Sequence, residues 1–342
     1  MSYHFEFRPY CRPFRTPLVT HHGLWQVREG IILRLSDHQG RCGYGEIAPV
    51  PWFGSESWEQ ALHFCTQLPP TLSDETLFSI LPTLPACQFG FETVRANLAR
   101  SLHHAELTPA RYSTLLPSGE AALSAWPILW DWGYRTFKLK IGIAPVSEEI
   151  QAIEKLLHQV PPEAVLRLDA NGGLDELVAR HWLDWSDSTC DRYRQSSQRA
   201  PQYPNQHPIE FIEQPLPPEQ FATLLKLSQR YQTPIALDES VATFEQLKAH
   251  YYKGWPGIYV IKAAISGSPT RLKKFCVAHP IDFVMSSVFE TAIGRQAVID
   301  LALQLETLTA HPAPRALGMG TQQWFHQDGF YQSDWATLWE QL

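Results

Sequence analysis

The sequence has none of the features typical of secreted, membrane-spanning or nucleic-acid-binding proteins. Its six cysteines are scattered and form no CxxC pair, which favours free thiols in a reducing cytoplasm over disulfides or a zinc site. No apolar run approaches the roughly 18 residues that a membrane span requires. A net charge of −7 argues against a nucleic-acid partner, which usually selects a basic face.

The first residues also lack the basic region and apolar core of a secretory signal, and they lead directly into a strand-like alternation. We therefore expect a cytoplasmic protein whose partner is a small molecule. With 342 residues and 44% apolar content, the chain can bury one large core and a smaller one. This size predicts two domains, or one barrel of about 250 residues with an addition.

Residues 1–105 are predicted to form a separate α+β domain. Two strand-like runs flank the turn Asp37–Gly40, which is the pattern of a hairpin, and residues 3–10 alternate weakly. Helical spacing follows over 57–67 and 89–103. We expect the C-terminal tail, residues 322–342, to pack back on this domain.

From residue 112 the pattern changes to strands that alternate with helices, which predicts a parallel sheet. The candidate strands are 112–116, 135–141, 165–169, 209–213, 234–238, 257–262, 281–285 and 314–317. The amphipathic stretches between them are 118–132, 148–159, 174–186, 219–231, 244–251, 269–278 and 291–308. Eight such repeats predict an α/β fold, a (β/α)7β TIM-like barrel over residues 106–321 with the α+β domain as its cap.

One segment, residues 187–207, is long, polar and without periodicity. It lies between a predicted helix and the start of a strand, which is the face of a barrel opposite its active site. We expect a mobile surface insertion without a catalytic role.

The barrel is organised around the strand that contains Lys138 and Lys140. Apolar residues alternate with these two lysines, so both ammonium groups are predicted to lie on one side. In most strands with a KxK pattern, the two lysines simply lie on a face that is exposed to solvent. Here, however, the next three strands each end in a carboxylate, at Asp169, Glu213 and Asp238, and a fifth strand ends in Lys262.

Strand ends meet the βα loops at the face where barrel enzymes place their active sites. Three carboxylates gathered there would repel one another unless a cation lies among them. Oxygen ligands suit a hard divalent ion, so we expect Mg²⁺, with Mn²⁺ as the alternative. Any one of these residues alone would be better explained as a helix cap or an ion pair.

A lysine is a poor base at its usual pKa of about 10.4. A second ammonium and a metal ion nearby disfavour its protonation, so one of the lysines becomes a usable base. The set of groups suits removal of a proton α to a carboxylate, with the developing charge stabilised by the metal. Lys262, on the opposite wall, is predicted to be a second acid/base or a fixed cation.

These motifs resemble the enolase superfamily, in its muconate-lactonising-enzyme branch. The resemblance covers nearly the whole chain and rests on KLK (138–140), DAN (169–171), IEQP (212–215), LDES (237–240) and the strand-ending Lys262. Within the branch, residues 115–119, 286–290 and 318–321 are most similar to the o-succinylbenzoate synthase family. That family is expected to dehydrate 2-succinyl-6-hydroxy-2,4-cyclohexadiene-1-carboxylate in menaquinone or phylloquinone synthesis.

The resemblance also implies a role for each matching residue. Lys140 would abstract the α proton, Lys138 would keep the pKa of Lys140 low, and Lys262 would stabilise the dienolate. The implied Mg²⁺ ligands are Asp169, Glu213 and Asp238, with Asn171 and Glu239 as outer supports. The implied contacts to the succinyl tail are Ser286 and Ser287.

Several alternatives remain open at this stage. The same scaffold supports a racemase, epimerase or cycloisomerase, in which Lys262 is a second base, and a carboxylate-binding barrel without catalysis is a third hypothesis. Arg167 points into the cavity or pairs with Glu210 or Glu213. Two segments, His21–Gly23 and Trp52–Phe53, are either capping loops that close over the barrel or ordinary surface loops. The sequence does not predict an oligomeric state.

Overall fold

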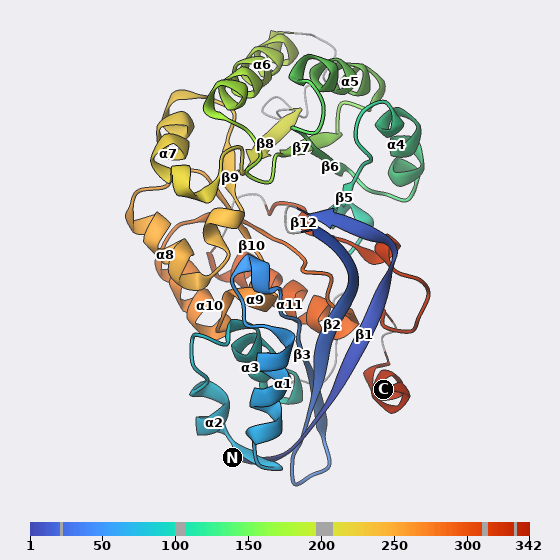
Figure 1. The fold of residues 1–342 in the computed structure, drawn as a ribbon, viewed down its shortest axis with the longest axis vertical. Helices are drawn as coiled ribbons and strands as arrows, with labels where there is room; N and C mark the ends of the chain where they lie inside the picture. Colours follow the sequence, from blue (N-terminus) through green and yellow to red (C-terminus); the bar gives the residue numbers. More distant parts are fainter. Residues whose placement is uncertain (21–22, 100–106, 196–207, 310–313, 332–333) are drawn as a thin grey trace.

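The structure is a computed structural model that describes residues 1–20, 23–99, 107–195, 208–309, 314–331 and 334–342. It contains a four-stranded antiparallel sheet and an eight-stranded parallel sheet. The larger sheet and its helices form the upper part of Figure 1, and the smaller sheet lies below it. No helix in these ranges is long and apolar enough to cross a bilayer.

The small sheet has the strand order β3-β2-β1-β4. Its strands are β1 (Ser2–Thr20), β2 (Gly23–Ser36), β3 (Cys42–Ile47) and β4 (Thr71–Ser73). The predicted hairpin is confirmed, because β2 and β3 pair antiparallel on either side of the turn at Asp37–Gly40. Gly40 has a φ of +75°, a backbone conformation that glycine adopts at little cost.

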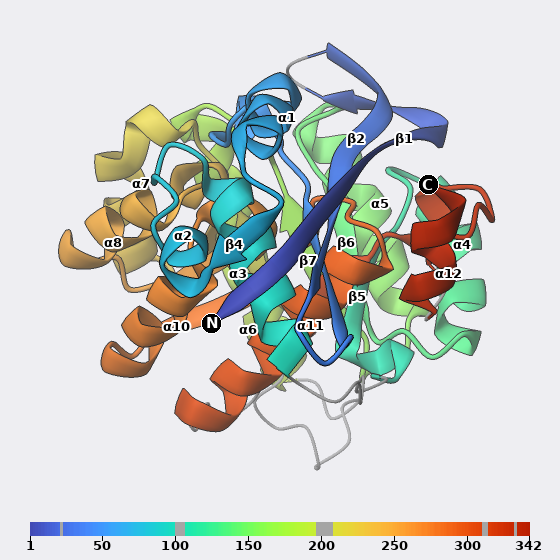
Figure 2. The same cartoon turned by 90° about the horizontal axis from the view of Figure 1, so that it is seen from below.

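Helices cover one face of this sheet and the C-terminal helix covers the other (Figure 2). The helices are η1 (Pro51–Phe53), α1 (Trp58–Gln67), α2 (Asp74–Phe78), α3 (Pro85–Ala99) and the C-terminal α12 (Trp335–Gln341). Ser57 begins α1 with a capping box to Gln60. Helix α3 begins four residues before the predicted 89, because the buried carboxylate of Glu56 accepts from the backbone N–H groups of Ala86 (3.0 Å) and Cys87 (2.7 Å).

The large sheet has the order β11-β10-β9-β8-β7-β6-β5-β12, and a parallel bridge between Ser286 and Gly318 joins its two edges. Its strands are β5 (Tyr112–Leu115), β6 (Thr136–Lys140), β7 (Val165–Asp169), β8 (Ile209–Glu213), β9 (Ile235–Leu237), β10 (Ile258–Ile261), β11 (Asp282–Met285) and β12 (Leu317–Gly320). The (β/α)7β barrel is therefore confirmed.

Seven helices connect consecutive strands of the barrel on its outside. They are α4 (Ala121–Asp131), α5 (Val146–Gln159), α6 (Glu176–Gln195), α7 (Phe221–Arg230), α8 (Phe244–Tyr252), α10 (Pro269–Ala278) and α11 (Ala292–Thr309). Short elements among them are η2 (Pro109–Arg111), η3 (Pro218–Gln220), η4 (Glu239–Val241), α9 (Ala263–Ser266) and η5 (Gln322–Trp324). The predicted domain boundary at 105/106 falls at the edge of residues 100–106, outside the described residues, and stays a prediction.

Two further predicted boundaries are wrong. The last strand begins at Leu317 rather than 314, because Pro314 has no N–H for the ladder and the Arg315 guanidinium binds Asp282 (2.6 and 2.7 Å). Helix α6 continues to residue 195, through the first part of the segment predicted to be an aperiodic insertion. Tertiary contacts support this polar stretch: the Tyr193 hydroxyl donates to the carbonyl of Leu157 at 2.9 Å. Residues 196–207 lie outside the described part.

An ion-pair network lies in the barrel on the side away from the carboxyl ends of the strands. The Arg167 guanidinium donates to Glu210 (2.7 Å) and to Ser113 (3.3 Å). Arg315 joins Glu210 (2.5 Å) to Asp282. The sequence predicts that Arg167 either points into the cavity or pairs with Glu210 or Glu213. The structure has the ion pair with Glu210, below the level of Asp169 at the end of β7.

A single carboxylate, Glu46 on β3, joins the small sheet to the barrel. Its side chain is fully buried and accepts from the Tyr10 hydroxyl (2.6 Å) within the small sheet. It also accepts from the backbone N–H of Thr291 (3.0 Å), the Thr291 hydroxyl and the N–H of Gly294 (2.9 Å), at the beginning of α11. The carboxylate thus satisfies free donors at a helix N-terminus, where negative charge is favourable.

The C-terminal helix lies against the same small sheet, beside β1 in Figure 1. Trp335, Leu338 and Trp339 of α12 are buried in one cluster with Tyr10 and Ile32. Burial of two tryptophans in this cluster stabilises the contact between the tail and the sheet.

We predict that Glu46→Ala lowers the free energy of unfolding by about 3 kcal/mol, because the buried donors of Tyr10, Thr291 and Gly294 lose their acceptor. Gly294→Ala should also destabilise, although alanine favours a helix, because its Cβ would lie 2.7 Å from Glu46 Oε2. Urea unfolding measures both, with Glu29→Ala on the exposed face of β2 as the control. Unchanged midpoints in both variants would contradict this role of Glu46.

Candidate active site at the carboxyl ends of the barrel strands

Three carboxylates lie at the ends of consecutive strands. Asp169 ends β7 and pairs in register with Glu213, which ends β8, while Asp238 follows β9 directly. All three are buried, with exposures of 3%, 2% and 3%. The parallel register therefore brings the three predicted acidic residues to one edge of the sheet, as the sequence predicts.

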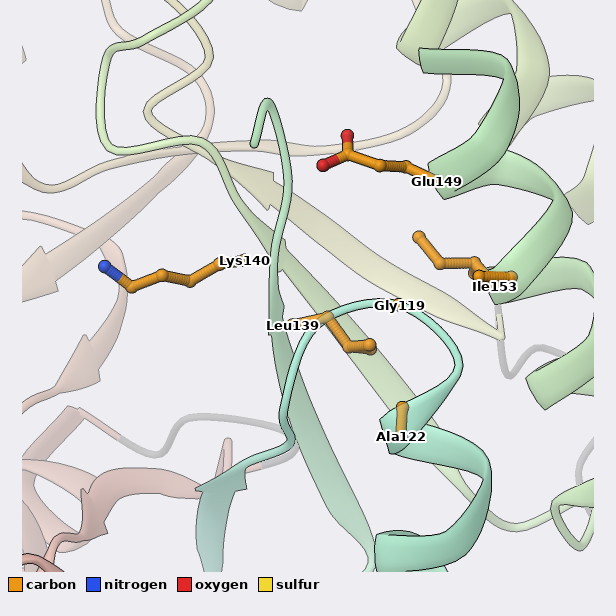
Figure 3. A pocket seen from close by; sticks show the side chains of 7 residues that line it. Gly119, Ala122, Leu139, Lys140, Glu149 and Ile153 are labelled. Carbon is orange, nitrogen blue, oxygen red and sulfur yellow. The ribbon is translucent and has the colours of Figure 1, made fainter. Parts of the chain in front are cut away.

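The two lysines of β6 lie beside these carboxylates. Lys140 is in register with Asp169, and its side chain leaves the strand on the side opposite to Leu139 and Ile153 (Figure 3). Leu139 and Ile153 line a small cavity between β6 and the outer helices α4 and α5, so the Lys140 ammonium points to the inside of the barrel. That small cavity is not the candidate active site.

The three lysines of the site differ in the ion pairs that they form. The Lys138 ammonium donates to Asp169 (2.7 Å) and Glu213 (2.8 Å), and the Lys262 ammonium pairs with Asp238. Lys140 forms no ion pair with any residue that the structure describes. Of the three, Lys140 is therefore the lysine whose nitrogen is available to a substrate.

Burial and neighbouring charges shift the pKa values of the acidic side chains at this site. Burial, together with the charge of Asp169, raises the pKa of Glu213 to about 8. Burial also raises the pKa of Asp238 and that of Glu239. Burial opposes the charged form of Asp169 as well, but the nearby Lys138 ammonium outweighs it and lowers that pKa. Burial thus disfavours the charged forms of Glu213, Asp238 and Glu239, a cost that a bound cation would offset.

The pKa of Lys138 is raised, because the charges of Asp169 and Glu213 outweigh its burial. Lys138 therefore stays charged and is unsuited to be the base.

The donor set fits Mg²⁺, because it consists of buried carboxylate oxygens at adjacent strand ends. Within the described ranges no three His, Cys, Asp or Glu side chains form a ready-made metal cluster. Instead the carboxylate oxygens contact the lysine ammonium groups, so the acids would exchange these partners for a divalent cation.

Asn171, for which the family resemblance implies an outer supporting role, hydrogen-bonds to two of the acids. Its backbone N–H donates to Asp169 Oδ1 (3.0 Å), and its side-chain amide donates to Asp169 Oδ2 (3.3 Å) and Glu239 Oε1 (3.1 Å). The residue has a φ of +46°, in the left-handed region that asparagine tolerates better than most residues. Asn171 thus links two of the carboxylates through one amide.

Gln214 is a supporting residue that the sequence analysis did not single out. It is fully buried with a φ of +37°, and its Oε1 accepts from the backbone N–H groups of Asp238 (3.0 Å) and Ser240 (3.1 Å). Its Nε2 donates to Leu216 O (2.9 Å) and Ser240 Oγ (2.7 Å). The sequence feature that could have identified Gln214 is its position in the IEQP motif, directly after Glu213.

The predicted tail contacts lie in the loop after β11. The Ser287 hydroxyl donates to the buried Glu290 and accepts from the N–H of Phe289 (2.8 Å), so it is engaged within its own loop. The backbone N–H of Ser286 donates to Ile261 O (2.9 Å), next to Lys262. A substrate role for Ser286 and Ser287 stays a prediction.

The two candidate capping segments can be placed only in part. His21 and His22 lie outside the described residues. Trp52 and Phe53 form the short helix η1, and the ring of Phe53 covers the Lys262 ammonium. This segment of the cap therefore reaches the candidate site.

Comparison with known proteins finds the same two parts. A family described as "Enolase C-terminal domain-like" matches residues 124–332, and one described as "MenC, N-terminal domain" matches residues 4–98. The chain is 41% identical to an o-succinylbenzoate synthase of Thermosynechococcus vestitus, over 93% of this chain and 92% of the relative. It is 24% identical to an L-Ala-D/L-Glu epimerase of Bacillus subtilis, over 88% and 83% of the two chains.

Among solved structures, the fold superposes on an o-succinylbenzoate synthase from Thermosynechococcus elongatus BP-1 with Mg in its active site. The TM-score is 0.86 at 38% identity, and the match covers 99% of this chain and all of the other. A muconate lactonizing enzyme from Pseudomonas putida shares the fold at a TM-score of 0.64 and 18% identity, over 95% and 89% of the two chains.

We predict that Gln214→Met lowers Mg²⁺ affinity by about 10- to 100-fold, because the Asp238 loop loses the acceptor that orients it. The variant should also lose about 2 kcal/mol of stability, since two buried N–H groups are left unpaired. Calorimetric titration with MgCl₂ and urea unfolding measure the two effects. Gln220→Met, on an exposed side chain, is the matched control, and equal Mg²⁺ affinities for both variants would refute the role.

Proposed function

Because the chain belongs to the enolase superfamily, we propose that it is a Mg²⁺-dependent lyase of the o-succinylbenzoate synthase type. It dehydrates 2-succinyl-6-hydroxy-2,4-cyclohexadiene-1-carboxylate to o-succinylbenzoate, a step in menaquinone or phylloquinone synthesis. The observation that carries the proposal is the placement of Lys140, with no ion pair among the described residues, beside the paired acids and Lys138.

Lys140 is the acid and base of the reaction. Its neutral amine takes the proton from the ring carbon that carries the carboxylate, and the electron pair left behind is delocalised into that carboxylate. The resulting ammonium then gives the proton to the departing hydroxyl group, which leaves as water. One lysine serves both steps because proton and hydroxyl leave from the same face of the ring.

The other two lysines supply fixed charge. Lys138 remains protonated between Asp169 and Glu213, and its fixed positive charge attracts the substrate carboxylate. Lys262, from β10 on the facing wall, stabilises the negative charge that develops on the ring. Neither lysine needs to transfer a proton in the dehydration.

Asp169, Glu213 and Asp238 would hold Mg²⁺, with Asn171 and Glu239 as the residues that orient them. Bound there, the ion acts as a Lewis acid that stabilises the negative charge on the substrate carboxylate. The succinyl tail lies toward the loop at Ser286 and Ser287. Formation of an aromatic ring favours the elimination strongly, so these residues need only to position the substrate.

Racemisation or epimerisation of an acylated amino acid is the second candidate function. It is favoured by the placement of Lys262 across the barrel from Lys140, since two bases on opposite faces of a carbon are what inversion requires. The epimerase relative is less similar to this chain than the synthase relative, at 24% against 41% identity.

We predict that Lys140→Arg and Lys140→Met each lower kcat for dehydration by at least about 10³-fold, because neither side chain can accept the α proton at this position. Mg²⁺ affinity should change little, since Lys140 forms no ion pair with the described acids. Ultraviolet absorbance follows the aromatic product. Lys155→Met, on the exposed face of α5, is the control, and a wild-type protein without turnover would overturn the proposed function.

We predict that Lys262→Arg slows racemisation of an N-acyl amino acid far more than it slows dehydration. Arginine keeps the positive charge that the elimination uses but cannot serve as the second base. Parallel assays with both substrates, with solvent deuterium incorporation at the α carbon, measure the two rates. If the substitution abolishes both reactions equally, Lys262 has a role other than that of a fixed cation.

A further inference from the structure

We propose that Phe53, a residue of the cap, is a positioning residue for Lys262. The Lys262 ammonium lies 3.9 Å from the centroid of the Phe53 ring and pairs with Asp238 at the same time. It is thus held between a carboxylate from the barrel and an aromatic face from the cap. The inference rests on the proposed function, because it concerns the lysine that stabilises the ring charge.

The turn that carries Phe53 is rigidly built on the small sheet. The buried guanidinium of Arg28 on β2 donates to Pro49 O (2.9 Å) at the base of the turn. The N–H of Phe53 donates to Val50 O (2.9 Å), and the N–H of Val50 donates to Ser55 Oγ (2.7 Å). The turn therefore has little freedom to move its aromatic ring.

The same turn is held between two other parts of the active-site rim. Gly54, with a φ of +97°, lies against the loop at Thr243, where an added Cβ would be 3.4 Å from Cγ2. Trp52 packs edge-on against Trp25 of β2, with 4.9 Å between the ring centroids. Trp25 packs edge-on against Phe289, with 5.5 Å between the ring centroids. These contacts tie the position of the Phe53 ring to the loops after β9 and β11.

An aromatic ring suits this task better than a second carboxylate would. A lysine side chain has four rotatable bonds, and Asp238 would exchange its ion pair with Lys262 for a bound cation, so the ammonium needs a second partner to hold it. The negative face of a ring attracts the ammonium from another direction without accepting a proton. Phe53 thereby holds Lys262 in place and leaves its charge available to the substrate.

Replacing Phe53 with 4-fluoro-, 3,5-difluoro- and 3,4,5-trifluorophenylalanine tests this directly, because the ring keeps nearly the same shape while its face becomes less negative. We expect kcat for dehydration to fall stepwise along the series, by about 3- to 30-fold in total, with KM nearly constant. The same series at Phe64, a half-buried ring of α1 that faces Phe91, is the control and should leave kcat unchanged.

A second readout needs neither substrate nor metal. In the metal-free protein, acetylation of Lys262 followed by mass spectrometry should become faster stepwise along the Phe53 series, while Lys226 on α7 reacts at a constant rate. If kcat and the acetylation rate are both flat along the series while the wild type dehydrates its substrate, the positioning role is overturned and the proposed function stands. If the wild type is inactive, the proposed function fails, and the acetylation rates alone decide whether the ring holds the lysine.

Discussion

The site depends on one electrostatic constraint: acidic side chains on consecutive strands share a buried space in which they repel one another. The parallel register of β7 and β8 leaves Asp169 and Glu213 side by side, and Asp238 follows on the next strand. Such a cluster is tolerable only with cations among its members. Lys138 and Lys262 supply part of the compensation, and the rest favours a divalent ion. The chemistry follows from the same constraint, because a site that stabilises a cation beside a carboxylate substrate also stabilises an enediolate.

The cap is joined to the barrel by the same type of interaction, a buried carboxylate at a helix N-terminus. Glu46 of β3 accepts from the beginning of α11, and Glu92 of α3 accepts from the N–H of Thr270 (3.1 Å) in the first turn of α10. Arg12 of β1 adds an ion pair to Asp328 (2.5 and 2.9 Å) after the last barrel strand. These contacts are directional, and the side chains of Glu46, Glu92 and Arg12 are buried, so the contacts determine how the cap is oriented. That orientation places the Phe53 ring over Lys262.

Most of the barrel was predictable because its signals are local. Strands that alternate with amphipathic helices give the correct element types in the described parts of residues 112–309, except at residues 187–195, which continue helix α6. Two of the errors share one cause, which is a tertiary contact that overrides the local pattern. The polar part of α6 is helical because Tyr193 contacts Leu157, and α3 begins early because Glu56 caps it from a distant loop. Such partners are far away in the sequence, so the hydrophobic periodicity of the helix itself does not reveal them.

By itself, the sequence determined the residue types at the strand ends, and therefore the three acids and the three lysines, because strand periodicity and parallel pairing place such residues on one edge. Only the tertiary structure decided which lysine is engaged and which is available, how Gln214 orients the Asp238 loop, and that Arg167 pairs with Glu210 below the site. It also brought Phe53 to Lys262. These features depend on distances between segments that no local pattern encodes, since side-chain pairing is chosen by packing after the strands have assembled.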